Sequence, residues 1–178
     1  MLMRKILDRE DPILRQKAVP VPLADIAGHN VQTIIREMID AMSLQKDGVA
    51  IAAPQIGVSS QIFVVSGSLL KQADASYKGE PTELVFINPE IIKMSKEKKS
   101  VEEGCLSVRW FYGKVRRSVR VTLRAYNEKG QRIERGASGL LAQIFQHEVD
   151  HLNGILFTDK AKEVWQMTTE EIEELQRK

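Results

Sequence analysis

The sequence predicts a single compact α+β domain, on three observations. Its 178 residues, 43% of them hydrophobic and 28% charged, suit one globular unit with its own core. Several runs with β-strand character precede a helical segment near the C-terminus, an order typical of α+β folds. The chain contains no repeats, linkers or low-complexity tracts that would divide it. We therefore expect residues 1–178 to form one domain.

Composition narrows the function classes. The 26 Lys and Arg residues nearly balance the 24 Asp and Glu residues, and a net charge of +2 does not indicate binding to DNA or to an anionic membrane. No apolar run approaches the roughly 18 to 20 residues that span a bilayer, and the N-terminal segment lacks the apolar block of a signal peptide. The single cysteine, Cys105, excludes an internal disulfide and suits a reducing compartment. We expect a cytoplasmic protein that binds neither DNA nor a membrane.

The N-terminal third contains one predicted helix. Residues 1–25 include three prolines among unpatterned apolar residues, so we expect an extended strip laid over the body. Apolar residues recur at helical spacing over 31–44, which predicts a helix there. The following segment 48–58, GVAIAAPQIGV, is too short for a helix and too interrupted for a central strand. We expect it to pack closely against its neighbours.

The middle of the chain predicts strands. QIFVVSG (61–67) and ELVFINPEII (83–92) are rich in β-formers, and the polar segment 71–81 between them predicts a loop. Over 118–134 apolar and polar residues alternate and then meet the turn sequence NEKG, which predicts a hairpin.

Two helices are predicted after these strands. The first begins after Ser138 as N-cap, runs to Leu152 and stops at Gly154. Thr168 followed by Glu171 forms a capping-box pattern that opens an acidic C-terminal helix within 167–178.

The first of these helices carries His147 and His151, one turn apart. Residues four apart on a helix share a face, with Cβ atoms about 5 to 6 Å apart, so both imidazoles can bind one cation. Glu148 lies beside them, where a carboxylate can act as a general base. Solvated helices also carry this short pattern, so it leaves both a metal site and a plain surface helix open.

A catalytic metal site needs a third protein ligand and an open position. Metzincins place a histidine where this chain has Phe157, which excludes that arrangement. A downstream glutamate, Glu170 or Glu171, could complete a thermolysin-like site, although an acidic helix is typical of a solvated face. Cys105 is the other candidate, because thiolate binds zinc and ferrous iron well, whereas a lone cysteine is often simply buried.

Three segments taken together resemble the peptide deformylase family. These are GVAIAAPQ (48–55), EGCLS (103–107) and QHEVDH (146–151), and their order and spacing also fit. DPILR near the start is similar to the family's N-terminal segment, so the resemblance extends to about Thr158. It implies antiparallel or mixed sheets packed around a central metal-binding helix, followed by the C-terminal helix.

The resemblance implies one divalent metal ion per chain, held by Cys105, His147 and His151 with water as fourth ligand. Ferrous iron is the ion it favours, and zinc or nickel can occupy such a site. The implied reaction is hydrolysis of the N-formyl group from the N-terminal methionine of nascent bacterial polypeptides, with release of formate. The implied partners are N-formylmethionyl nascent peptides, and a ribosome contact stays open.

The resemblance also implies catalytic roles for three residues. Glu148 moves a proton from water to the leaving amine. The side-chain amide of Gln55 and the backbone N–H of Leu106 stabilise the oxyanion. From its local sequence alone, Gln55 would stabilise a turn.

Substrate recognition is expected from two groups of residues. The pocket for the methionine side chain is expected at Leu140, Gln143 and Ile144, which share the face of His147. Backbone groups that pair with an extended peptide are expected at Gly48, Val49, Ala50 and Gly104.

The chain departs from the family pattern at three positions. Ala50 replaces a second glycine, Arg109 replaces a proline and Gln143 replaces an aliphatic pocket residue. These departures leave an alternative open, a divergent deformylase-like protein with altered substrate preference or low activity. Arg117 is expected to pair with an acid such as Glu103.

Overall fold

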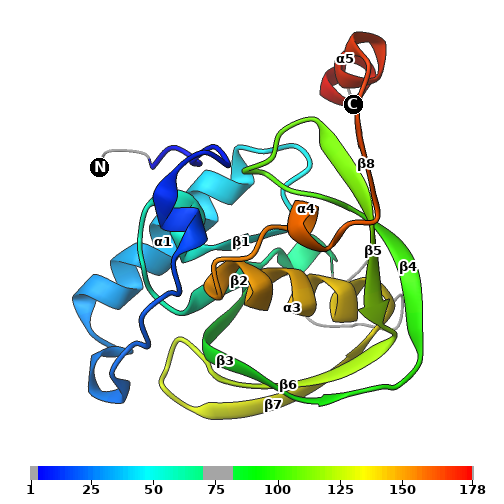
Figure 1. Ribbon diagram of the computed structural model, residues 1–178. Coiled ribbons are helices and arrows are strands. Elements are labelled where there is room, and N and C mark those ends of the chain that lie inside the picture. The colour runs from blue at the N-terminus through cyan, green and yellow to red at the C-terminus, as the bar shows by residue number, and fades with distance from the viewer. Residues whose placement is uncertain (1–3, 70–81, 178) are drawn as a thin grey trace.

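Helix α3 (Gly139–Leu152) runs through the middle of the molecule, with strands on both sides (Figure 1). The computed structural model describes residues 4–69 and 82–177. Further helical elements include η1 (Pro12–Arg15), η2 (Leu23–Asp25), α1 (His29–Ser43), η3 (Ala53–Ile56), α4 (Phe157–Lys160) and α5 (Thr169–Arg177). The strands are β1 (Ala50–Ala52), β2 (Ile62–Val65), β3 (Leu84–Met94), β4 (Lys98–Gly104), β5 (Phe111–Ser118), β6 (Arg120–Tyr126), β7 (Arg132–Ser138) and β8 (Glu163–Gln166).

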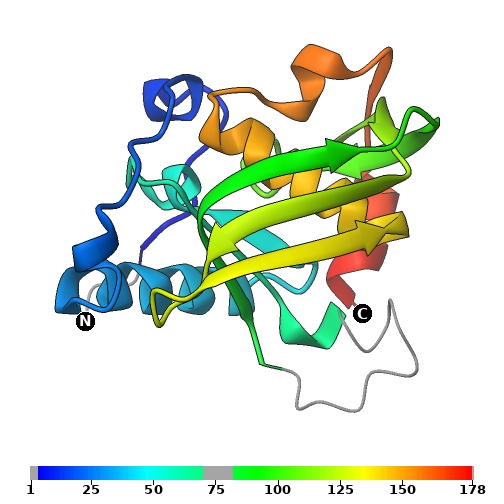
Figure 2. The same cartoon turned by 90° about the horizontal axis from the view of Figure 1, so that it is seen from below.

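The strands of the described residues form two antiparallel sheets. One has the order β1-β2-β3-β6-β7 and the other the order β4-β5-β8. Figure 2 shows β3, β6 and β7 side by side with α3 behind them. The predicted hairpin is confirmed, because β6 and β7 pair from Arg120 and Ser138 to Tyr126 and Arg132, and Asn127 N–H donates to the Gln131 carbonyl across the turn.

The larger sheet is covered on both faces near β2. Side chains of Phe63 and Val65 pack in the cluster that includes α3, whereas Ile62 and Val64 pack in the cluster that includes α1. Successive residues of a strand point to opposite faces, so a strand that is apolar throughout fits a position between two helices. The architecture is a single compact α+β domain, as predicted.

The N-terminal half differs in detail from the prediction. The strip is not extended throughout, because Asp11 caps the Ile13 N–H at the start of η1, and η2 lies within residues 1–25 as well. Helix α1 begins two residues before the predicted range. The segment 48–58 divides into the edge strand β1 and the short helix η3. The predicted loop 71–81 lies outside the described residues.

Strands β5 and β8 were not predicted. Every residue of β8 is exposed, so neither face of this strand is buried. Its sequence EVWQ therefore lacks the alternation of apolar and polar residues that predicts a strand. The predicted capping box is confirmed, since Thr168 N–H donates to the Glu171 carboxylate (2.7 Å) and Glu171 N–H donates to the Thr168 hydroxyl (3.3 Å). Helix α5 projects beyond the body (Figure 1). Within the described ranges, no helix combines the length and apolarity needed to span a membrane.

Candidate active site

Three possible metal ligands converge between α3 and the end of β4. The Nε2 atoms of His147 and His151 lie 3.2 Å apart, and the Cys105 Sγ lies 3.2 Å from His151 Nε2. Among the described residues, these three form the one group of histidine, cysteine and carboxylate side chains close enough to share an ion, with ligand atoms within 4.8 Å of one another. Cys105 follows Gly104, where an added Cβ would meet the Tyr112 ring at 2.7 Å. Glycine at this position therefore leaves room for the Tyr112 ring beside the end of β4.

The donor set fits a divalent cation. With bonds of about 2.0 to 2.3 Å, a tetrahedral ion holds its ligands roughly 3.4 Å apart, close to the spacing around His151. The pKa of Cys105 falls from its ordinary value of 9.0 to about 5, because the nearby His151 and His147 imidazoles outweigh the burial that opposes ionisation. A thiolate with two imidazoles suits zinc or ferrous iron, and three ligands leave a fourth position for water.

Glu148 is buried beside this cluster, with 4% of its surface exposed. Burial raises its pKa above the ordinary 4.5. Within the described part of the chain its Oε2 atom is buried and has no hydrogen-bond partner, and the residue lines a cavity shared with His147. A buried oxygen of this kind is suited to accept a proton from a water molecule in that cavity.

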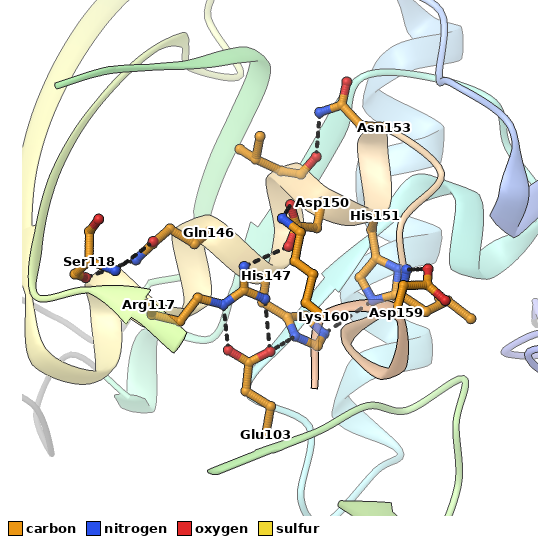
Figure 3. Close-up of polar contacts among 12 residues, drawn as sticks. Glu103, Arg117, Ser118, Gln146, His147, Asp150, His151, Asn153, Asp159 and Lys160 are labelled. Carbon is orange, nitrogen blue, oxygen red and sulfur yellow. Dashed lines mark hydrogen bonds and ion pairs between the residues drawn. The ribbon is translucent and has the colours of Figure 1, made fainter. Parts of the chain in front are cut away.

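A buried ionic network orients one histidine (Figure 3). Arg117 donates to both oxygens of Glu103 (2.7 and 2.9 Å) and to Asp150 (2.6 Å), and Lys160 donates to Asp150 (2.6 Å). Glu103 accepts from His147 Nδ1 at 2.9 Å, which leaves Nε2 facing the thiol. Burial opposes ionisation of Glu103, yet Arg117 and His147 lower its pKa to about 2. The predicted pairing of Arg117 with Glu103 is therefore confirmed.

Gln55 faces the same cluster from η3. Its Oε1 accepts the Ala52 N–H (2.8 Å), so its amide nitrogen points toward the Ser107 hydroxyl (3.2 Å) and the Cys105 sulfur (3.5 Å). Gln55 thus stabilises a turn and also presents donors to the cavity. Leu106 lines the cavity next to the thiol.

Most of the predicted substrate-binding residues line this cavity. They are Val49, Ala50, Gly104, Leu140, Gln143 and Ile144. Gly48 lies outside the lining, and an added Cβ there would meet the Met42 carbonyl oxygen at 2.6 Å. Gln143 donates to the Glu102 carbonyl at 2.7 Å and so ties α3 to β4.

Several contacts around the cavity have no local signal in the sequence. Asp47, Trp110 and Tyr112 also line it, and Arg109 pairs with Asp47 at 2.6 Å across 62 residues. The alternative ligand Glu171 is bonded within its cap in α5 instead. The described residues therefore give no support to a thermolysin-like site.

Comparison with known proteins identifies the family. A family model described as polypeptide deformylase matches residues 3–166. The chain belongs to the peptide deformylase family. Peptide deformylase 2 from Clostridium acetobutylicum is 40% identical over 163 residues, covering 92% of this chain and 98% of the relative.

Solved peptide deformylase structures share the fold. The Thermotoga maritima enzyme superposes with a TM-score of 0.78 at 35% identity, covering 92% of this chain and 100% of that one. An actinonin-bound class I type b enzyme from Acinetobacter baumannii has a TM-score of 0.78 at 33% identity, covering 91% and 100% of the two chains. The deformylase family model ends with the last residue of β8, so α5 lies beyond the matched region.

Proposed function

We propose that this protein is a metal-dependent hydrolase that removes the N-formyl group from the N-terminal methionine of nascent polypeptides and releases formate. Membership of the peptide deformylase family supports this activity. The observation that carries it is the convergence of Cys105 with His147 and His151, since the thiol comes from a segment 46 residues before His151. We propose that the protein acts in the cytoplasm of a bacterium, where such substrates are made, and ribosome contact remains a prediction.

We propose that these three side chains hold one divalent ion, ferrous iron in preference to zinc or nickel. A thiolate and two imidazoles are ligands that all three metals accept. A divalent cation in such a site lowers the pKa of a bound water to about 7, so that a nucleophile is available near neutral pH. Elemental analysis of protein purified without oxygen identifies the metal.

Glu148 is assigned the proton transfers. Its buried Oε2 accepts a proton from the attacking water and delivers it to the nitrogen of the methionine as the formyl C–N bond breaks. Burial supports this role, because a raised pKa makes the carboxylate a stronger base toward water and keeps the carboxyl group protonated until the amine takes up the proton.

Gln55 and Leu106 are assigned to the formyl oxygen. The Gln55 amide is already oriented by Ala52, so no side-chain rotation is needed when negative charge develops. The Leu106 N–H, next to the thiol, provides the second donor.

The peptide is assigned to the groove between β1 and β4. Val49 and Ala50 lie on one wall and Gly104 on the other, and an extended chain pairs with such edges through its backbone. The methionine side chain enters the pocket of Leu140, Gln143 and Ile144. A relative from Acinetobacter baumannii crystallised with Met-Ala-Ser supports formyl-Met-Ala-Ser as a test substrate.

Formate release tests the proposal. We expect the iron-loaded protein to release formate from formyl-Met-Ala-Ser, and Glu148→Gln to lower kcat by about 10²- to 10⁴-fold with metal content unchanged. Cys105→Ala should lose both metal and activity. Tight peptide binding without formate would identify the divergent alternative, and full activity of Cys105→Ala would exclude the assigned metal ligands.

A further inference from the structure

Arg109 joins the two walls of the cavity. Its Nη1 donates to Asp47 (2.6 Å) and its Nη2 donates to the Gln45 side chain (2.7 Å). Gln45 and Asp47 precede β1, whereas Arg109 follows β4. We refer to Gln45, Asp47 and Arg109 as the Arg109 clamp.

The clamp has a defined geometry. The side chains of Arg109 and Asp47 are only 26% and 30% exposed, and the Arg109 guanidinium carbon lies 5.2 Å from the centroid of the Trp110 ring. Trp110 adopts φ 65°, a left-handed conformation that large side chains rarely take. Its carbonyl accepts the Met167 N–H at 2.8 Å, so the end of β8 holds this rim in place.

The clamp lies where the peptide main chain is assigned. Asp47 and Arg109 line the same cavity as Val49 and Gly104. Tyr112 packs against Gly104. Burial, and to a smaller extent the negative charge of Asp47, raise the pKa of Tyr112. These contacts connect both walls of the cavity.

The charges of the clamp are balanced. Arg109 and Asp47 neutralise each other, whereas Glu102, which also lines the cavity, has no ion-pair partner among residues 4–69 and 82–177. Removal of Arg109 would leave two carboxylates facing a bound peptide. Neutralisation of Asp47 would leave a guanidinium opposite a single carboxylate.

We propose that the Arg109 clamp is a specificity determinant for the substrate residues that follow formyl-methionine. It holds the two cleft walls at a set separation and determines the charge that these residues meet. The inference rests on the proposed function and adds to it a selection among nascent peptides by charge.

Two charged peptides test the clamp. We compare kcat/KM for formyl-Met-Lys-Lys and formyl-Met-Glu-Glu in the iron-loaded protein. Arg109→Gln should raise the Lys-to-Glu ratio about two- to fivefold, and Asp47→Asn should lower it by a similar factor. The change should fall on KM, because the clamp does not touch the reacting atoms, and the double variant should return toward the wild-type ratio.

An exposed ion pair provides the matched control. Lys114 and Glu163 pair at 2.9 Å between β5 and β8 and do not line the cavity. Lys114→Gln and Glu163→Gln should leave the ratio unchanged.

Opposite changes of the Lys-to-Glu ratio of kcat/KM in Arg109→Gln and Asp47→Asn support the inference. Shifts in the same direction, or none, overturn it, because a merely collapsed cleft would lower kcat/KM for both peptides together. If the wild-type protein releases no formate, the proposed function fails, and the dissociation constants of Met-Lys-Lys and Met-Glu-Glu, measured by calorimetry, test the clamp by the same ratio.

Discussion

The two sides of α3 meet different surroundings. On one side, Phe145 contacts Phe86 (ring centroids 5.0 Å apart) within a fully apolar cluster against the five-stranded sheet. On the other side, His147 and Asp150 meet Glu103 and Arg117 through charged contacts of 2.6 to 2.9 Å. Helix α3 thus has one side that packs against the sheet and another that carries the charged residues of the site.

The apolar side of α3 stabilises the fold, whereas the charged side orients the site. Apolar burial is non-directional and roughly proportional to area, so it stabilises without fixing one atom against another. In a buried ionic network the loss of hydration offsets much of the attraction between charges, although removal of one partner is still costly, and its hydrogen bonds have defined directions. The network therefore orients His147, while the aromatic side holds the helix in place.

The largest expected effect on stability is at Phe145. Phe145→Ala should lower the free energy of unfolding by about 3 to 5 kcal/mol, because it leaves a cavity between α3 and the sheet. Urea unfolding measures the change, and Phe145→Leu should lose less. Folded Phe145→Ala should still bind metal; a loss below about 1 kcal/mol would mean that this face does not stabilise the fold as described.

The next effect is the response of stability to acid. Glu103 has a pKa of about 2 in the folded protein against an ordinary 4.5, so its contribution is present above pH 4.5 and is lost as pH falls toward 2. This contribution is about 3 kcal/mol. In metal-free protein, Glu103→Gln should be less stable at pH 6 and should lose less stability than wild type between pH 5 and pH 3.

Exposed Glu134 supplies the control for this prediction. Glu134→Gln should keep the wild-type acid response, and Phe145→Ala should keep it too. An unchanged acid response in Glu103→Gln would show that the network does not set the pH dependence.

The smallest effect is expected at the outer end of the network. Lys160 is 41% exposed, so its pair with Asp150 is screened by solvent. Lys160→Gln should change stability by less than about 1 kcal/mol and leave kcat within about twofold. A loss of stability as large as that of Glu103→Gln would show that the buried network includes Lys160 at the surface.

Local patterns predicted α1, α3, α5 and several strands, because these elements depend on neighbours in the chain. The periodicity of α1, the turn between β6 and β7, and the cap at Thr168 are visible in short windows of sequence. Strand β8 was missed because all of its residues are exposed and its pairing with β5 is non-local. The motifs indicated the candidate site through a family resemblance, while the Arg109 clamp has no comparable signal.

Local sequence was enough to bring His147, Glu148 and His151 together, since helical geometry places residues one turn apart on one face. The packing of distant segments brings Cys105 to them, Asp150 and Lys160 to Arg117, and Asp47 to Arg109. Such contacts depend on how two sheets pack around α3, and no local rule relates side chains 46 or 62 residues apart.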